Sequence, residues 1–340
     1  MKNTSDPLLS NCTICPRNCG VNRSAGRTGY CGQTAVPHIA RAALHFWEEP
    51  CISGTGGSGT VFFVGCNLGC VFCQNHMIAH ADASFNLTHT ETSIHKITSA
   101  NTNNIPIPGR KVNARNLAKI FLSLQEQGAH NINLVTPTHF VPQIVDALYL
   151  AKSDGLNLPI VYNSSCYEKV ETLKRLDGLI DIYMPDMKYY SDSVSRAYAN
   201  APDYFSTATA ALAEMHRQVG EPLFDNKITF DIESKQDPSE TALMKKGIIV
   251  RHLLLPGHTN DSCYILQYLY ETYGDSVYIS IMNQYTPMSR LVLPSPLNRK
   301  VTAREYNKVV DYAISIGITN AFIQDGPTAS ESFIPSFYPA

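Results

Sequence analysis

Short apolar runs alternate with amphipathic stretches along the chain from about residue 60 onwards. Seven of these runs are almost continuously apolar, as in parallel strands that are covered on both faces. The predicted strands span residues 60–65, 132–136, 159–163, 179–184, 248–255, 276–282 and 318–323.

Between the predicted strands, apolar residues recur at the i, i+3, i+4, i+7 spacing of a helix face. This spacing is clear at residues 117–124, 141–148 and 306–313, and Asn113 and Gly128 are candidate start and stop signals of the first helix. Alternating strands and helices predict a parallel sheet, either doubly wound or closed into a full or partial (β/α) barrel. Periodicity does not choose between these architectures.

Two polar stretches, residues 81–112 and 221–246, interrupt this alternation. We expect both to be surface excursions between elements of the sheet. For the first stretch the alternatives are a lid over a nearby cysteine group and a plain solvated loop.

Composition excludes several classes of protein. The 340 residues suit one α/β domain of about 250 residues with an appendage, and 16% charged residues argue against a disordered chain. A net charge of −2 gives no reason to expect a membrane or nucleic-acid partner. With no signal segment, we expect a cytoplasmic location, where the ten cysteines would serve metal binding or catalysis rather than disulfides.

Three of these cysteines follow directly on the first predicted strand. Cys66, Cys70 and Cys73 have the spacing C-x3-C-x2-C. Three thiolates can hold a cubane iron–sulfur cluster and leave one iron without a protein ligand, whereas a structural zinc site takes four ligands. The alternative is therefore a zinc loop completed by His76 or His80.

This spacing, with Phe72 before the last cysteine, resembles the signature of radical S-adenosylmethionine (SAM) enzymes. The resemblance implies an α/β fold with a full or partial TIM-like barrel. It implies a [4Fe-4S] cluster on Cys66, Cys70 and Cys73 whose open iron binds S-adenosylmethionine, with Phe72 beside the adenine. An electron from a reductant such as flavodoxin or ferredoxin then gives methionine and a 5′-deoxyadenosyl radical, which abstracts hydrogen from a substrate.

Residues 73–75 and 184–188 are similar to pyruvate formate-lyase-activating enzymes. This similarity implies that Asp186 and a backbone carbonyl serve a monovalent cation and that Lys188 binds the methionyl carboxylate. Asn163 and Ser164 fall where these activases carry an Asp-Thr-Asn run that serves the same sites. Without the motif, Asp186 and Lys188 would be an ordinary surface pair.

Five longer stretches resemble the X-type (PflX-type) branch of these activases, over about residues 12–326. They are residues 41–54, 133–139, 215–220, 250–257 and 322–326. One departure is the end of the second strand, where most radical enzymes of this type carry Gly-Gly-Glu. Thr136 and Thr138 stand there instead and are candidates to accept hydrogen bonds from the cofactor's ammonium group, and the departure equally fits an altered use of the cofactor.

A second cysteine group, Cys12, Cys15, Cys19 and Cys31, supplies four ligands, which suit zinc or a fully ligated second [4Fe-4S] cluster. We favour zinc, because a short closed knuckle is stable with it. Residues 7–47 carry four arginines and no acid or lysine. We interpret them as charge compensation of this site, with an anionic binding face as the alternative.

Several polar residues lie at or near the predicted barrel. Arg251 lies within an apolar strand and is predicted either to reach the cofactor carboxylate or to pair with a barrel carboxylate. From their sequence context alone, Glu48 and Glu49 would be solvated helix-end charges. Residues 283–285 end the sixth predicted strand, where the activases place a cofactor-contacting residue.

Together these features predict a partial (β/α) TIM-like barrel of the radical SAM type at residues 48–326. A Cys-rich metal-binding segment would precede it at 1–47, and a tail would follow at 327–340. The implied activity is that of a radical SAM oxidoreductase, with a protein glycyl residue as the activase-like target. The alternatives are radical modification of a small molecule or RNA and a non-catalytic iron–sulfur or zinc scaffold.

Overall fold

The computed structural model describes residues 6–79, 109–225, 242–287 and 293–324. Among the earlier predictions, His80, nearly all of 81–112, residues 226–241 of the second polar stretch and the proposed tail lie outside the described residues. Within the described residues, no helix is both long enough and apolar enough to cross a membrane.

Helices and strands alternate along the described chain. The strands are β1 (His38–His45), β2 (Ser58–Phe63), β3 (Arg110–Lys111), β4 (Ile132–Val135), β5 (Ile160–Ser164), β6 (Ile182–Pro185), β7 (Leu223–Phe224), β8 (Met244–Leu253), β9 (Tyr278–Met282) and β10 (Ala321–Ile323). The α-helices are α1 (Pro7–Ser10), α2 (Pro50–Ser53), α3 (His76–Ala79), α4 (Ala114–Glu126), α5 (Val141–Ser153), α6 (Val170–Leu173), α7 (Asp192–Ala199), α8 (Tyr204–Val219), α9 (Thr259–Tyr273) and α10 (Ala303–Ser315).

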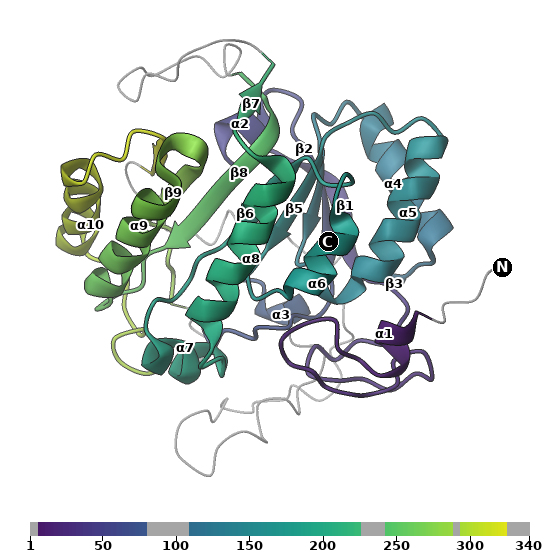
Figure 1. Cartoon of the computed structure of the whole chain (residues 1–340), viewed down its shortest axis with the longest axis horizontal. Coiled ribbons are helices and arrows are strands. Elements are labelled where there is room, and N and C mark those ends of the chain that lie inside the picture. Colours follow the sequence, from purple (N-terminus) through teal and green to yellow (C-terminus); the bar gives the residue numbers. More distant parts are fainter. Residues whose placement is uncertain (1–5, 80–108, 226–241, 288–292, 325–340) are drawn as a thin grey trace.

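One sheet runs through the described part of the molecule in the order β10-β9-β8-β6-β5-β4-β2-β1-β3. From β2 to β10 every neighbouring pair in this order is parallel. Because each parallel strand is added on the same side of the previous one, right-handed crossovers place the helices on one face of the sheet. Figure 1 shows these helices around the strands, from α4 and α5 through α8 to α9 and α10. The architecture is a partial (β/α) barrel, which confirms the predicted fold class.

All seven predicted strands are present, as β2, β4, β5, β6, β8, β9 and β10. The predicted helices are α4, α5 and α10, and the Asn113 side chain caps α4 by accepting a hydrogen bond from the Asn116 N–H at 2.8 Å. The antiparallel strand β1, which lies between β2 and the short edge strand β3, was not predicted. Its side chains are mostly half-exposed, so it lacks the continuous apolar run of the inner strands. The predicted division at residue 47 falls just after β1 and stays a prediction.

The barrel has an apolar core on each face of the sheet because neighbouring residues of a strand point to opposite sides. Tyr162 of β5 packs in the large core between sheet and helices. Its neighbour Val161 packs inside the barrel with Ile182, and Cys51 and Ile52 of α2 complete this inner cluster. Figure 1 places α2 at the end where the strands begin. The inside of the barrel therefore holds an apolar cluster towards its amino end, and charged side chains lie towards the carboxyl end.

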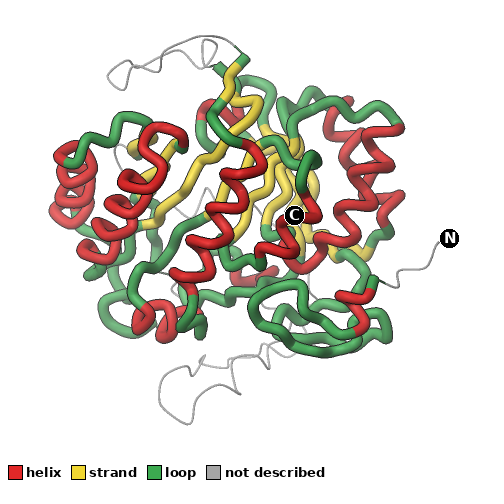
Figure 2. The backbone as a smooth tube through the Cα atoms, in the orientation of Figure 1, coloured by secondary structure: helices red, strands yellow, loops and turns green. Residues whose placement is uncertain are grey.

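The N-terminal segment, residues 11–37, folds almost without regular elements (Figure 2). Arg23 is 1% exposed and donates hydrogen bonds to the carbonyls of Gln33, Thr34 and His139, at 3.0, 2.8 and 2.7 Å. A buried guanidinium that satisfies three carbonyls takes the place of a regular hydrogen-bond ladder here. The last of these bonds also attaches the segment to the barrel, just before α5.

The inner cluster yields a prediction for stability. Ile52 is fully buried, and we expect Ile52→Ala to lower the free energy of unfolding by about 2–5 kcal/mol because it leaves a cavity beneath the polar layer. Urea denaturation followed by circular dichroism measures the change. Ile314 of α10 is 63% exposed, and its alanine variant is the matched control, with an expected change within about 0.5 kcal/mol. If both variants lost a similarly small amount of unfolding free energy, the inner cluster would not be tightly packed around Ile52.

Candidate active site at the carboxyl ends of the strands

The three cysteines of the C-x3-C-x2-C motif lie on the loop that follows β2. Gly65 and Gly69 have φ of 90° and 69°, a left-handed backbone that glycine adopts without strain. These two turns let the loop fold back on itself, and Cys66, Cys70 and Cys73 all line one cavity. The predicted group of three thiols is therefore brought to one site.

The other strand ends contribute polar side chains to the same cavity. Of the predicted cofactor residues, those that line it are Phe72, Thr136, Asn163, Ser164, Asp186 and Lys188. Thr138 is the exception. It is buried outside the cavity lining, and its hydroxyl donates a hydrogen bond to Glu168 Oε1 at 2.6 Å. The geometry therefore gives no support to Thr138 as a cofactor residue.

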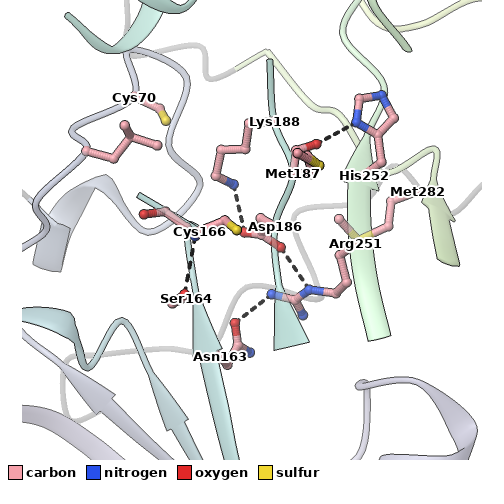
Figure 3. Close-up of polar contacts among 12 residues, drawn as sticks. Cys70, Asn163, Ser164, Cys166, Asp186, Met187, Lys188, Arg251, His252 and Met282 are labelled. Carbon is pink, nitrogen blue, oxygen red and sulfur yellow. Dashed lines mark hydrogen bonds and ion pairs between the residues drawn. The ribbon is translucent and has the colours of Figure 1, made fainter. Parts of the chain in front are cut away.

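Asp186, just after β6, is held between two cations inside the barrel. Lys188 Nζ lies 2.7 Å from its Oδ2, and Arg251 Nε lies 2.9 Å from its Oδ1. Figure 3 shows the two cations approaching opposite sides of the carboxylate. Since the Asp186 and Lys188 side chains are each only 17% exposed, the alternative of an ordinary surface pair is wrong.

Arg251, on β8, connects three further elements of the barrel. Besides Asp186, its guanidinium donates hydrogen bonds to Asn163 Oδ1 on β5 at 2.7 Å and to Glu48 Oε2 before α2 at 3.1 Å. Of its two predicted roles, pairing with barrel carboxylates is the one that the geometry bears out. All three nitrogens of the guanidinium are thus engaged with side chains of the site.

Burial and charge act against each other in this network. Burial alone would raise the pKa of Asp186, but the charges of Arg251 and Lys188 outweigh it and lower the pKa. For Lys188, burial alone would lower the pKa, and the Asp186 carboxylate raises it. Both groups are therefore ionised at neutral pH. Because Lys188 has three N–H donors and Asp186 occupies one, the ammonium group can also bind a carboxylate of a ligand.

Glu48 and Glu49 lie in the interior, so the prediction of solvated charges is wrong. Glu49 is 9% exposed, and burial raises the pKa of both carboxyl groups. Glu48 Oε1 also accepts a hydrogen bond from Asn133 Nδ2 at 3.0 Å. Asn133 was not predicted as a site residue, and its only signal was a polar side chain within an apolar strand. Burial of several polar side chains in one layer marks this part of the barrel as functional.

Thr136, at the turn after β4, has an unusual backbone. Its φ of 57° is left-handed, which costs a β-branched residue on the order of 1–3 kcal/mol. The turn places Thr136 on the cavity wall. Such strain persists where the surrounding structure imposes it, which is frequent at functional sites.

An aromatic group surrounds Phe72 beside the cysteines. Its ring makes edge contacts with Tyr189, Tyr198 and Tyr285, at centroid distances of 6.4, 6.4 and 5.7 Å. The Tyr189 hydroxyl donates a hydrogen bond to Cys70 Sγ at 3.2 Å. Nothing in the sequence marked Tyr189, because a tyrosine directly after the predicted segment 184–188 has no recognisable spacing.

The chemistry of the donor set tests whether these residues fit a cluster. Within the described part of the chain, no group of three or more His, Cys, Asp or Glu side chains is arranged to hold a single metal ion. In a cubane each cysteine binds an iron of its own, so its ligands need not converge on one atom. Cys66, Cys70 and Cys73 around one cavity, with Lys188 facing them, fit a cluster with one open iron.

The four N-terminal cysteines also lie near one another. Cys12, Cys15 and Cys31 are buried and Cys19 is half-buried. Burial raises the pKa of Cys15, and the other three thiols raise it further, which places all four within electrostatic reach. The choice between zinc and a second cluster at these cysteines stays a prediction.

Comparison with known proteins identifies a family. The sequence model described as the Radical SAM superfamily matches residues 60–244, which is more than half of the chain. An uncharacterized protein of Methanocaldococcus jannaschii, MJ0674, is 28% identical over 311 residues, which cover 90% of this chain and 75% of that protein.

Two solved structures of SuiB from Streptococcus suis are also similar. The complex with the precursor peptide SuiA has a TM-score of 0.45 at 12% identity and covers 76% of this chain and 46% of that chain. The structure with S-adenosylmethionine has a TM-score of 0.45 at 11% identity and covers 76% and 48%. The chain thus spans less than half the length of SuiB.

The ion network yields a prediction for stability and its pH dependence. We expect Arg251→Met to lower the free energy of unfolding at pH 7 by about 3–5 kcal/mol, because it leaves buried Glu48 without its cation and Asp186 with Lys188 alone. The lowered pKa of Asp186 means that its pairing stabilises the fold above the ordinary carboxyl range, at about pH 4. This contribution is lost as the pH falls through the lowered pKa, so the difference between variant and wild type should shrink in acid.

Chemical denaturation between pH 3 and pH 7 measures both effects. Arg299 is the matched control, because it pairs with Glu305 at 2.7 Å at the surface and is 42% exposed. We expect a much smaller loss from Arg299→Met than from Arg251→Met. Equal losses of unfolding free energy in the two variants at pH 7 would contradict the role given to the buried network in stability.

Proposed function

Because the chain belongs to the radical SAM superfamily, we propose that it is an enzyme that cleaves S-adenosylmethionine reductively with a [4Fe-4S] cluster on Cys66, Cys70 and Cys73. The observation that carries the proposal is that these three thiols share one cavity with Lys188 and Asp186, which lie far away in the sequence. The bound cluster would supply one electron, and the products would be methionine and a 5′-deoxyadenosyl radical that takes a hydrogen atom from the substrate.

The residues of the cavity have separate roles in this proposal. Lys188 donates hydrogen bonds to the methionyl carboxylate, and Asp186 fixes the position of the lysine. Asn163 is held by Arg251 and presents its amide to the same region. The Thr136 hydroxyl accepts a hydrogen bond from the methionyl ammonium, and Phe72 offers an apolar surface to the adenine.

Ser164 lines the same wall of the cavity and accompanies Asn163 in binding the cofactor. Thr138 has no role in this proposal because its hydroxyl is engaged by Glu168 outside the cavity lining. A monovalent cation beside Asp186 and zinc at the N-terminal cysteines stay predictions.

We extend the proposal to an activase-like oxidoreductase whose hydrogen donor is a backbone glycine of a protein. The similarity of residues 73–75 and 184–188 to pyruvate formate-lyase-activating enzymes supports this extension. A flavodoxin or ferredoxin would deliver the electron. Transfer of deuterium from α-deuterated glycine of a candidate protein into 5′-deoxyadenosine tests it, and transfer only from a small molecule or RNA would overturn it.

Formation of 5′-deoxyadenosine is the direct test of the activity. The protein is reconstituted anaerobically with iron and sulfide, reduced with dithionite and incubated with S-adenosylmethionine. We expect product from the wild type and no detectable product from Cys70→Ala, which lacks one cluster ligand. Cys263→Ala is the matched control, because Cys263 is a half-buried cysteine of α9 away from the cavity lining. If the wild type carries the cluster by spectroscopy and yields no product, the proposed activity is wrong.

The hydrogen bond from Tyr189 to Cys70 predicts an effect on the reduction potential. Hydrogen bonds to cluster sulfurs stabilise the reduced, more negative state. We expect Tyr189→Phe to lower the potential by about 40 mV, the one-electron equivalent of about 1 kcal/mol. Redox titration followed by electron paramagnetic resonance (EPR) measures it.

Tyr198→Phe is the matched control for this titration. Tyr198 makes the same edge contact with Phe72 at 6.4 Å, but its hydroxyl lies 2.9 Å from His258 Nε2 rather than at a cysteine. We expect the reduction potential of the cluster in Tyr198→Phe to stay at the wild-type value. Equal shifts in the two variants would show that packing and not the hydrogen bond sets the potential.

A further inference from the structure

The two cysteine groups meet at the start of the loop after β2. Gly65 directly precedes Cys66, and a Cβ atom built on it would lie 2.5 Å from the carbonyl oxygen of Cys31, the last N-terminal cysteine. A contact this close admits only glycine. The backbone of one cysteine group therefore packs directly on the backbone of the other.

Arg17, between the second and third N-terminal cysteines, holds the same loop by hydrogen bonds. Its guanidinium donates to the carbonyls of Asn67 and Leu68, at 2.8 and 3.0 Å. It also donates to the carbonyls of Ala199 and Asn200 at the end of α7, at 2.8 and 2.5 Å. One side chain thus satisfies four backbone acceptors that no helix or strand ladder serves.

Two aromatic rings fix the orientation of this guanidinium. The Tyr30 ring centroid lies 3.8 Å from Arg17 Cζ and the Tyr167 centroid 5.2 Å. The Tyr30 hydroxyl donates to the carbonyl of Leu68 at 3.2 Å. Tyr30 immediately precedes Cys31, so two separate parts of the N-terminal group contact the residues between Cys66 and Cys70.

We propose that the N-terminal four-cysteine segment is the support of the catalytic cysteine loop. Arg17 is a positioning residue that clamps Asn67 and Leu68, and through it the folding of the N-terminal site sets the conformation of the loop between Cys66 and Cys70. In this proposal Arg17 acts through hydrogen bonds of defined direction to specific carbonyls. Compensation of thiolate charge, by contrast, could be performed by any cation. The proposal rests on the proposed function only in regarding this loop as catalytic.

Amide hydrogen exchange of the anaerobically reconstituted full chain tests the clamp without relying on activity. The amides of Gly65 and Val71 are bonded to the carbonyls of Ile78 and Tyr198, at 2.7 and 2.9 Å, and report on the loop. We expect Arg17→Gln to accelerate exchange over residues 64–73 by about tenfold, because it removes charge-assisted hydrogen bonds. Exchange in α10 should stay unchanged, which shows that the variant is folded.

Three further variants separate the clamp from its alternatives. Arg17→Lys keeps the positive charge but loses the planar set of guanidinium donors. We therefore expect exchange over residues 64–73 to be as fast in Arg17→Lys as in Arg17→Gln. Arg27→Gln, at an exposed arginine of the same segment, should resemble the wild type. Cys15→Ser should also accelerate exchange over residues 64–73, since it disrupts the N-terminal site.

The response of the reduced cluster's EPR spectrum to S-adenosylmethionine provides a second measurement, and we expect Arg17→Gln and Arg17→Lys to weaken it. Wild-type exchange over residues 64–73 in Arg17→Gln would overturn the proposal. Wild-type exchange in Arg17→Lys would show that charge compensation is the whole role of Arg17. Wild-type exchange over residues 64–73 in Cys15→Ser would show that the N-terminal site does not set the conformation of the loop, and it would overturn that part of the proposal. A wild type that forms no 5′-deoxyadenosine would overturn the proposed function and leave these exchange results valid.

Discussion

The buried guanidinium of Arg251 is the interaction on which the inside of the barrel depends. Its bonds to Asn163, Asp186 and Glu48 join two neighbouring strands and the segment before α2 to β8. A buried charge is costly unless every partner is present, so these side chains form one unit. That unit fixes Asp186, which in turn directs Lys188 towards the cysteines. Asp186 and Lys188 thus belong both to the buried ion network and to the lining of the proposed cofactor cavity.

Polarity is distributed along the barrel in layers. An apolar cluster that includes Ile52 and Val161 lies towards the amino end, and the ion network lies beyond it. The three cysteines lie at the carboxyl ends of the strands, where an α/β barrel places its chemistry. The side chains of the network are largely buried, which strengthens their ion pairs. The N-terminal segment then supports the cysteine loop from the other side, through Arg17.

The sequence predicted those features that leave a periodic or spaced signal. The inner strands were found because they are continuously apolar, and the cysteine loop because its spacing is specific. The antiparallel strand β1 was missed because its side chains are mostly half-exposed. Thr138 was grouped with Thr136 by sequence. The backbone at Thr136 is left-handed, and Thr138, two residues later, no longer lies in the cavity lining. Arg17 was interpreted only as one of four compensating charges, since bonds to carbonyl groups leave no pattern in the side chains.

The central claim is that Cys66, Cys70 and Cys73 hold a [4Fe-4S] cluster with one iron free for S-adenosylmethionine. Mössbauer spectroscopy of the iron-57-reconstituted wild type, with and without S-adenosylmethionine, tests it most directly. The account predicts that one iron of a single cluster changes its isomer shift when S-adenosylmethionine is added, because that iron gains new ligands. A cluster whose irons are all unaffected, or a protein that binds no cluster at these cysteines, would contradict the account.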